Sequence, residues 1–396
     1  MVHKLNNKYK NIPLRYVFYN HINDIPNINW DLVNPKKNIF LSLSYLKTLE
    51  RTLSETISFR YILFYDKNTP VGFATTQLIK FNPEQLKLQG FPCRISDTIK
   101  NTLLKNTEVG VLICGNLFSC GEHGFVYNSN LVSSRMIYDS LSNALKEIRK
   151  SKNSNKPSFI LLKEFWPTSF SQSDYSKKHD FREFKIDVNM VLKIHSDWHT
   201  FEDYLTSLKT KFRTRAKNVF KKSENIIIKD FTSEDISTYK NEINILYLSV
   251  IEKADFKIEK LNASTFKSLK KELKDSFIFT GYFLEQKLVG FTTSFIQDNT
   301  IEANHIGIDY NYNTKYAIYQ KMLYNYVTLA ISKNAEELRL GRTAETIKSS
   351  VGAKPVDMKL YVRHGNSISN TLLKPLIELI SPNEYEIRNP FKLQSK

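Results

Sequence analysis

The chain has 396 residues, which is too long for one ordinary hydrophobic core and suits two domains of similar size. Its formal net charge is +17, but only 13 of its 57 cationic residues are arginine. Proteins that read nucleic acids depend on arginine forks and on aromatic side chains set among the cations, and the chain has no such interleaved patch. The charge alone therefore does not indicate a nucleic-acid reader, and it suits either a solvated basic surface or a negatively charged donor or carrier.

Three cysteines, Cys93, Cys114 and Cys120, are odd in number and fit no disulfide framework, which is typical of a reducing compartment. Cys114, Cys120 and His123 match no common zinc spacing, so we expect no metal site. Residues 1–10 are polar and lack the apolar stretch of a signal peptide, and the most apolar short run is far below the length of a membrane span. We therefore expect a cytoplasmic protein.

The first half predicts a hairpin followed by a helix and a strand. An apolar run at residues 61–65 leads through a polar turn into the hexapeptide VGFATT at 71–76, which is typical of a β-hairpin. An amphipathic helix over 137–149 and a strand over 159–162 follow.

A domain boundary is expected where a strand over 188–194 gives way to a helix. Ser196 and Asp197 provide N-cap chemistry, and apolar residues follow them at helical spacing. We place the boundary between residues 194 and 195, so that the expected domains are 1–194 and 195–396.

The second half repeats the first in its motif and in its order of elements. VGFTTS at 289–294 is almost identical to the earlier hexapeptide and again follows an apolar run, at 277–283, and a polar turn. A helix over 318–331 and a strand over 337–340 come behind it. The shared order predicts a duplicated domain, and the alternation of strands and helices predicts an α/β fold with a mixed (α+β) sheet.

A basic helix is expected over 209–222, where seven of fourteen residues are cationic and apolar residues recur at three- and four-residue spacing. Arg213, Lys217 and Lys221 recur every four residues and line one exposed flank. This flank is either an ordinary solvated face or a docking surface for a phosphate-bearing donor or an acidic carrier protein.

Ionisable residues on the strand over 301–309 are candidates for acid–base chemistry. In a regular strand His305 and Asp309 share a face, and Glu302 lies on the other. Because Asp309 would hold His305 in a chosen tautomer, His305 is the first candidate for a general base, and Glu302 is the second. A hydrogen-bonded core histidine and a turn aspartate are the structural alternatives.

A second ionisable cluster follows the strand over 337–340. Arg342, Glu345 and Lys348 crowd one side of a short segment that has a glycine at each end, Gly341 and Gly352. The C-terminal end of a strand is where α/β architectures usually bind ligands. We expect Lys348 to stabilise developing negative charge, and Arg342, Glu345 and Gly352 to contact substrate.

This order of elements, with a Lys-x3-Gly segment after the last strand, resembles the GNAT acyltransferase fold. The doubled form is similar to Fem-type peptidyltransferases and to BioF2-like acetyltransferase-domain proteins of peptidoglycan biosynthesis. The shared motifs are the basic helix, at Lys211, Arg213, Ala216 and Lys217, and a Gly-x3-Glu-x-Lys-x3-Gly-x2-Pro stretch, at Gly341, Glu345, Lys348, Gly352 and Pro355 with one inserted residue. The resemblance implies two tandem GNAT-like domains and an acyltransferase with no permanently bound cofactor, whose co-substrate is a thioester of CoA or of acyl carrier protein.

One departure from the GNAT pattern concerns the donor. Members that bind acetyl-CoA hold its pyrophosphate with a glycine-containing loop, whereas the corresponding segment here, Tyr310–Ala317, has no glycine. Acyl carrier protein, a long-chain acyl-CoA bound differently and aminoacyl-tRNA therefore stay open as donors. The acid that protonates the leaving thiolate has four equal candidates: Tyr310, Tyr312, Tyr316 and Tyr319.

The favoured function is an N-acyltransferase that moves an acyl group directly to a primary amine of a lipid or cell-envelope precursor, because no serine or cysteine nucleophile sits in a recognisable elbow. The first alternative is an aminoacyl-tRNA-dependent Fem-type peptidyltransferase, and the second is a catalytically silent GNAT-fold binding protein. An amphipathic segment over 372–380 leaves a peripheral contact with an anionic membrane open, beside plain packing of a terminal helix.

Overall fold

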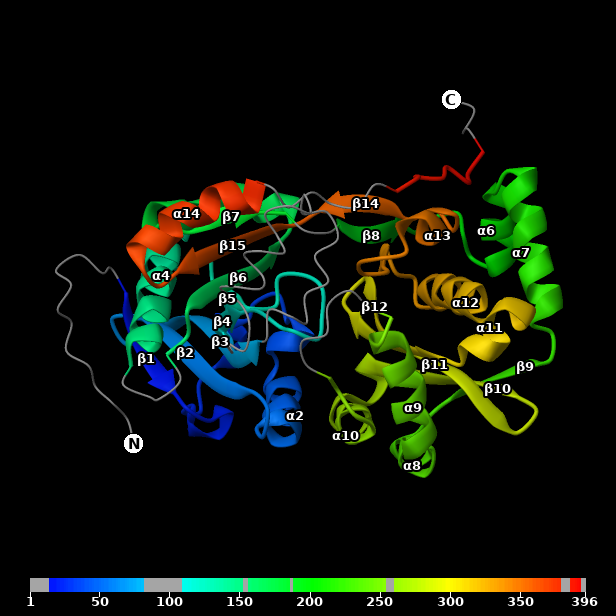
Figure 1. The fold of residues 1–396 in the computed structure, drawn as a ribbon, viewed down its shortest axis with the longest axis horizontal. Coiled ribbons are helices and arrows are strands. Elements are labelled where there is room, and N and C mark those ends of the chain that lie inside the picture. The colour runs from blue at the N-terminus through cyan, green and yellow to red at the C-terminus, as the bar shows by residue number, and fades with distance from the viewer. Residues whose placement is uncertain are drawn as a thin grey trace, which may run out of the picture. The chain divides into compact units, whose positions relative to one another are not determined.

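The computed structural model describes residues 14–81, 109–151, 156–185, 188–253, 260–378 and 385–392. The chain divides into two compact units, each with its own sheet. Unit 1 comprises Met1–Ile186, Asp255–Lys260 and Asp357–Pro382, and unit 2 comprises Asp187–Ala254, Leu261–Val356 and Asn383–Lys396. Both units mix strands and helices (Figure 1), which confirms the expected α/β class.

The sheet of unit 1 follows the order β1-β2-β3-β4-β6-β15-β7 in the described residues, and β5 pairs with β3 off this path. Its strands are β1 (Arg15–Tyr19), β2 (Ser58–Asp66), β3 (Thr69–Phe81), β4 (Val109–Cys114), β5 (Phe125–Tyr127), β6 (Phe159–Phe165), β7 (Arg182–Phe184) and β15 (Lys359–His364). Its helices are α1 (Trp30–Val33), α2 (Leu43–Leu53), α4 (Ser134–Lys150), α5 (Phe170–Ser173) and α14 (Ser367–Glu378).

The sheet of unit 2 follows the order β14-β8-β13-β12-β11-β10-β9. Its strands are β8 (Val188–Lys193), β9 (Ile226–Asp230), β10 (Phe277–Leu284), β11 (Lys287–Gln297), β12 (Thr300–Ile308), β13 (Glu337–Arg339) and β14 (Lys354–Asp357). Its helices are α6 (Phe201–Ser207), α7 (Thr210–Lys222), α8 (Ser233–Thr238), α9 (Lys240–Ile251), α10 (Ala263–Leu273), α11 (Tyr310–Tyr316), α12 (Ile318–Ser332) and α13 (Glu345–Ser349).

Each sheet contains one strand that comes from the other half of the sequence. β15 pairs antiparallel with β6 and with β7 in the sheet of unit 1. β8 pairs antiparallel with β13 and lies next to β14 in the sheet of unit 2. The observed division therefore differs from the boundary expected between residues 194 and 195, because β8 precedes that point and residues 357–382 return to unit 1. Apolar periodicity identifies a strand but carries no signal for its pairing partner.

The repeated hexapeptide forms the second strand of the same hairpin in both units. β2 and β3 pair antiparallel with a bulge after the Phe64–Gly72 pair, and β10 and β11 do so with a bulge after the Tyr282–Gly290 pair. A left-handed residue lies four positions before the hexapeptide valine in each turn, Lys67 in one and Glu285 in the other.

The glycine of the hexapeptide allows a helix to lie close to each sheet. A Cβ atom at Gly72 would lie 3.1 Å from Ile137 Cδ1 of α4, and one at Gly290 would lie 2.5 Å from Met322 Cε of α12. Both helices turn buried apolar residues toward their sheet at helical spacing. The duplication therefore includes the hairpin and the helix that packs on it.

Different helices cover the two faces of the sheet of unit 2. Val289 and Ile308 pack with Ile318 of α12 on one face. Phe291 contacts Phe266 of α10 on the other face, with ring centroids 5.8 Å apart. These contacts identify which way each side chain of the central strands points.

No helix in the described part of the chain is long and apolar enough to cross a membrane. The helix expected over 372–380 corresponds to α14, which begins earlier, at Ser367, and ends at Glu378. Most of the side chains that a membrane contact would use, at 372 and 374–380, lie outside the described residues, and so does Cys93.

Tyr361 of β15 provides a test of the strand exchange. Its side chain is buried in unit 1, where it contacts the ring of Phe165 and donates a 2.7 Å hydrogen bond to Asp174. We expect Tyr361→Ala to lower the free energy of unfolding by about 3–5 kcal/mol and to speed hydrogen exchange in β6. The control is Ile368→Ala on an exposed face of α14, for which we expect a change within about 0.5 kcal/mol. Equal effects of the two changes would show that β15 is not part of the core of unit 1.

Candidate active site

Strands β12 and β13 form the parallel pair of unit 2, and their pairing ends early. Thr300, Ile301 and Glu302 pair with the three residues of β13, after which β13 ends and β12 continues to Ile308. Beyond Glu302, β12 keeps its ladder with β11 on one side only. The backbone polar groups on the other side then need another partner, such as a ligand.

A bulge in β12 changes which side chains share a face. Asn304 and His305 together stand opposite Thr293 of β11. The Thr293 hydroxyl accepts a hydrogen bond from the His305 N–H at 2.8 Å and donates one to the His305 carbonyl at 3.2 Å. Because the residues on both sides of the bulge, Ala303 and Ile306, pack toward α12, His305 lies on the same face as Glu302. The expectation from regular alternation, which placed these two on opposite faces, is therefore wrong.

His305 points toward α9 and α10, away from α12. Its ring stands perpendicular to that of Tyr247, and Nδ1 lies 3.3 Å from the Tyr247 hydroxyl. Burial raises the pKa of Tyr247, so its hydroxyl stays neutral. When Nδ1–H donates to this hydroxyl, Nε2 is the nitrogen that accepts a proton. Nε2 is itself buried, so an amine reaches it only through a relay or after a movement of the side chains around it.

Glu302, the second candidate base, is engaged in an ion pair. Its carboxylate lies 3.0 Å from Arg339 Nη1, and its backbone pairs with the same residue in the β12–β13 ladder. Arg339 also contacts Glu337. Removing one partner of such a buried pair typically costs about 3–5 kcal/mol. This arrangement favours a structural role for Glu302 at the point where the two strands part.

Asp309 does not orient His305 in this structure. Its carboxylate accepts hydrogen bonds from Lys287 at 2.9 Å and from the backbone N–H of Asn311 at 3.1 Å, which makes it the N-cap of α11. β12 ends at Ile308, so Asp309 lies outside the strand whose alternation the expected His305–Asp309 pair depended on.

Helix α11 occupies the segment expected to correspond to the glycine loop of acetyl-CoA-binding GNAT proteins. Its last residue is followed by Ala317, which has a φ of 50° and precedes α12. The Asn313 side chain accepts from the Tyr319 N–H at 2.9 Å and so satisfies one of the first N–H groups of α12. The backbone at this helix end is therefore less available to a pyrophosphate than in a glycine loop.

The four candidate tyrosines differ in their surroundings. Burial, together with the charges of Tyr310 and Glu345, raises the pKa of Tyr319, and burial also raises the pKa of Tyr310. A phenol with a raised pKa is a weaker acid toward a leaving thiolate, whose pKa is about 8.5 for a cysteine-like thiol. Tyr310 and Tyr319 are consequently less suited as the acid than a phenol with an ordinary pKa.

The segment after β13 is strained and is held by β8. Gly341, Thr343 and Ala344 all have left-handed backbones, with φ of 70°, 62° and 53°. Such a conformation costs about 1–3 kcal/mol for a residue with a side chain. The Gly341 N–H donates to the Asn189 side chain at 3.1 Å, and its carbonyl accepts from the backbone of Met190 at 3.0 Å.

The buried side chain of Lys348 contacts the backbone of this segment. It is 5 % exposed, and its ammonium donates to the carbonyl of Arg342. Ile347, beside it in α13, packs into the cluster that contains α12, whereas His305 faces α9 and α10. Lys348 and His305 are therefore on different faces of the sheet, and the contact of Lys348 fits support of the strained segment.

Gly352 is a packing position. Its φ is 101°, and a Cβ atom there would lie 2.3 Å from the ring of Phe391. With Trp198 and Phe391 it lines a groove of about 910 Å³ along β8 and β14. Gly341 is the opposite case, since a Cβ atom there would have nothing within 4 Å.

A basic groove runs along α7 on a flank that only partly coincides with the one expected from the sequence. Its volume is about 710 Å³. Its charged lining consists of five cations and one acid: Lys211, Arg215, Lys221, Lys222, Lys315 and Glu224. Of the three residues of the expected flank, Lys221 lines the groove, whereas Arg213 and Lys217 are absent from the lining. Helical spacing marks every exposed cation of α7 alike, and only the packing of α11 beside α7 determines which flank becomes a groove.

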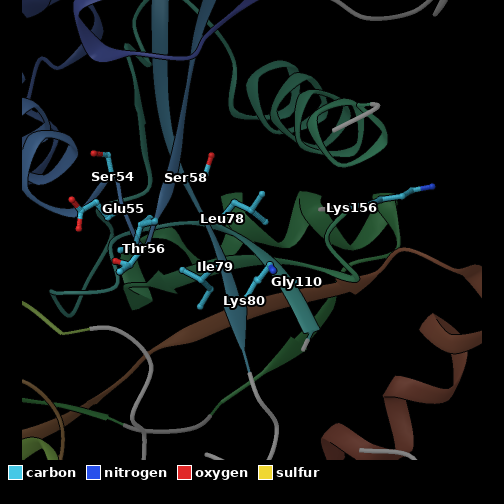
Figure 2. Close-up of a pocket in the computed structure, with 10 residues that line it drawn as sticks. Ser54, Glu55, Thr56, Ser58, Leu78, Ile79, Lys80, Gly110 and Lys156 are labelled. Carbon is cyan, nitrogen blue, oxygen red and sulfur yellow. The ribbon is translucent and has the colours of Figure 1, made fainter. Parts of the chain in front are cut away.

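Unit 1 has a polar hollow of about 550 Å³ at the opposite end of β4 from Cys114. Figure 2 shows Ser54, Glu55 and Thr56, which come from the connection between α2 and β2, and Lys80, which comes from β3. None of the site residues expected from the sequence lines this hollow.

Comparison with solved structures identifies the fold. FemX matches with a TM-score of 0.51 and 11% identity over 84% of this chain and 94% of its own. A tandem GNAT protein from the clavulanic acid biosynthesis pathway, solved without acetyl-CoA, matches with a TM-score of 0.51 and 9% identity over 89% of this chain and 99% of its own. No protein-family model and no curated protein matches the sequence. The chain has the tandem GNAT fold, and the expected resemblance is confirmed at the level of structure.

Substitutions at the two glycines that flank α13 distinguish the cost of steric crowding from the cost of backbone strain. Gly341→Ala adds a side chain in open space, so we expect only the left-handed penalty, about 1–2 kcal/mol in the free energy of unfolding. Gly352→Ala adds the same kind of strain and also displaces the Phe391 ring, so its cost exceeds that of Gly341→Ala. Chemical denaturation measures both. The pair Gly352→Ala with Phe391→Ala is the control, and non-additive costs are expected because the two residues are in contact.

Proposed function

We propose that the protein is an N-acyltransferase, which transfers an acyl group from an activated donor directly to a primary amine. The observation that carries the proposal is the early end of the β12–β13 pairing in a tandem GNAT fold. A thioester carbonyl placed in this opening meets backbone N–H groups of β12, and these stabilise the negative charge that develops on its oxygen. The acceptor we favour is an amine of a lipid or cell-envelope precursor.

The donor, in this proposal, lays its phosphate groups in the groove along α7. Lysine and arginine side chains there replace the backbone cradle that α11 and Asn313 leave incomplete. Lys315 of α11, the helix that directly follows β12 in the chain, lines the same groove. Side-chain cations suit CoA and acyl carrier protein alike, since both carry phosphate next to the thioester arm.

His305 is the proposed general base, and Glu345 is proposed to contact substrate on the face of the sheet that α12 covers. A lysine-like amine with a pKa of ~10.4 is neutral in only about one molecule in 2,500 at pH 7, which costs ~4.6 kcal/mol. A base that removes the proton during the reaction supplies about 10²–10⁴-fold in rate. Tyr247 supports this role, since its hydroxyl is placed to accept from Nδ1. Arg342 is proposed to contact the donor, and Lys348 is proposed to support the backbone beneath it.

The groove predicts which cations bind the donor. Arg215→Ala and Lys315→Ala each remove a charge-assisted contact, so we expect each to weaken the binding of palmitoyl-CoA or acyl carrier protein about tenfold. The matched control is Lys217→Ala on the same helix but outside the groove, for which we expect a change of less than about twofold. Isothermal titration calorimetry at two salt concentrations measures the affinities. If Lys217→Ala has the larger effect, the donor uses the flank expected from the sequence.

An aminoacyl-tRNA donor is the second candidate, because the same groove presents five cations to a polyanion. Salt dependence separates the two donors. The affinity for tRNA falls linearly on a logarithmic scale with a slope set by the number of neutralised phosphates, about 0.9 per contact for duplex regions. A thioester donor with three or fewer phosphates has a correspondingly shallow slope.

His305→Gln tests the base. We expect the maximal rate of acyl transfer to fall by about 10²–10⁴-fold with donor affinity unchanged, because the proton then has no acceptor. Tyr247→Phe removes the acceptor of Nδ1–H and is expected to lower the rate by a smaller factor while the fold is kept. The measurement is transfer of a radiolabelled acyl group to an amine across pH 6–9. An unchanged rate in a stable His305→Gln protein would show that His305 has only a structural role in the bulge. If the wild type itself transfers no acyl group, the silent binding protein becomes the favoured function.

A further inference from the structure

Unit 1 gathers buried charges where its own parallel strands part. β4 and β6 pair in parallel as far as Cys114 and Leu162, after which β4 ends and β6 continues to Phe165. The connection 115–124, which we call the 115–124 loop, follows β4 directly. The same place in unit 2 is the opening between β12 and β13, so each unit has polar side chains at the C-terminal ends of a parallel pair.

A strained ion pair in β6 holds this loop. Lys163 and Glu164 are neighbours in a strand, yet both side chains turn inward, because Glu164 has a φ of 59° and the register with β15 shifts at this point. Lys163 Nζ lies 2.8 Å from Glu164 Oε2, with the two side chains 7% and 2% exposed. The ammonium donates to the carbonyl of Ser119 at 2.6 Å, and the Gly121 N–H donates to the same Glu164 oxygen at 2.7 Å.

This arrangement has two costs. A left-handed backbone at a residue with a side chain costs about 1–3 kcal/mol, and desolvation of a buried ion pair is only partly repaid by the attraction between its charges. A Cβ atom at Gly115 would lie 2.4 Å from the Lys163 side chain, so the close approach also requires a glycine. Strain of this kind is concentrated at functional sites, and here it fixes the shape of the 115–124 loop.

The 115–124 loop also carries Glu122, a carboxylate whose described hydrogen-bond partners are neutral groups. Glu122 Oε1 accepts a hydrogen bond from the backbone N–H of Trp166 at 2.6 Å, and Oε2 accepts one from the Ser169 hydroxyl at 3.0 Å. These two donors are neutral, whereas Glu164 is paired with an ammonium. Glu122 is half-buried and so remains in reach of a small ligand.

The surroundings of Glu122 favour its neutral form more than water does. Burial raises its pKa, against the two hydrogen bonds and the charges of Lys36 and His123, which lower it. From α4, Tyr138 also faces this carboxylate, and burial followed by the charge of Glu122 raises the pKa of that phenol. A carboxyl group with a raised pKa takes up a proton more readily than one in water.

We propose that the 115–124 loop of unit 1 is a second substrate site, in which Glu122 binds a protonated primary amine and takes up one of its protons. A carboxylate has about four acceptor positions, and the two donors described leave positions for an ammonium. In this step one N–H bond of the ammonium breaks and an O–H bond forms on Glu122, which leaves a neutral amine and a neutral carboxyl group. The choice of an amine rests on the proposed function, whereas the site itself rests on the geometry of the loop.

The test measures amine binding without any acyl donor, so its outcome is independent of whether acyl transfer occurs. The probe is n-butylamine, with n-butanol as its uncharged analogue, followed by ligand-observed NMR on the full chain from pH 5 to 9. We expect saturable binding of n-butylamine, binding at least tenfold weaker in Glu122→Gln, and no competition by n-butanol. Binding strengthens as the pH rises through the pKa of Glu122, because the carboxylate becomes charged while the amine stays protonated.

Two further variants keep the test decisive. Glu55→Gln changes an exposed carboxylate at the opposite end of the sheet and is expected to bind the probe like the wild type. Ser169→Ala removes one donor to the carboxylate, so the pH midpoint of binding is expected to move upward even if Glu122→Gln fails to fold. Equal binding by wild type and Glu122→Gln, no saturable binding by the wild type, or an unmoved midpoint in Ser169→Ala would each overturn the proposal.

Discussion

Both candidate sites depend on a parallel strand pair that stops pairing before both of its strands have ended. Backbone N–H and C=O groups beyond that point need partners, because burying them without hydrogen bonds is costly. Unit 1 places the 115–124 loop against β6 and fixes it with Lys163 and Glu164. Unit 2 keeps β12 extended, absorbs one extra residue in a bulge at Thr293, and leaves the side toward β13 without a ladder after Glu302. In unit 1 a loop therefore covers the point where the parallel strands part, whereas in unit 2 one side of β12 stays without a paired strand at that point.

The exchange of strands determines how the segment after β13 is held beside the unpaired part of β12. β8 follows unit 1 in the sequence but supplies Asn189 and Met190, which hold both the N–H and the carbonyl of Gly341. These hydrogen bonds fix the start of the segment that contains the strained residues after Gly341. The contact of Lys348 with Arg342 holds the same segment further along the chain. A change in the connection between β7 and β8 is thus expected to reach the candidate site through the backbone, without any contact with a substrate.

Local sequence signals predicted the fold well and the site less well, for physical reasons. The two hexapeptides, the apolar runs before them and the helices behind them are local patterns, and both hairpins and both helices form where expected. The pairing of β8 and β15 is long-range and has no periodic signature. A single extra residue at Asn304–His305 reverses strand alternation, so face arguments fail for residues on opposite sides of the bulge, such as Glu302 and His305. The groove flank of α7 depends on α11, a helix inside a segment read only as a loop without glycine.

The two units share a hairpin and a helix contact, yet the charged groups of their proposed ligand surfaces differ. In unit 1 the loop presents Glu122, a carboxylate held by neutral donors, and its ammonium at Lys163 is already neutralised by Glu164. In unit 2 the groove presents five cations and one acid. A transfer reaction between a phosphate-bearing donor and an amine requires recognition of one anion and one cation, and a single site of either sign would repel one of the two. A carboxylate in one unit and a basic groove in the other satisfy both requirements within one chain.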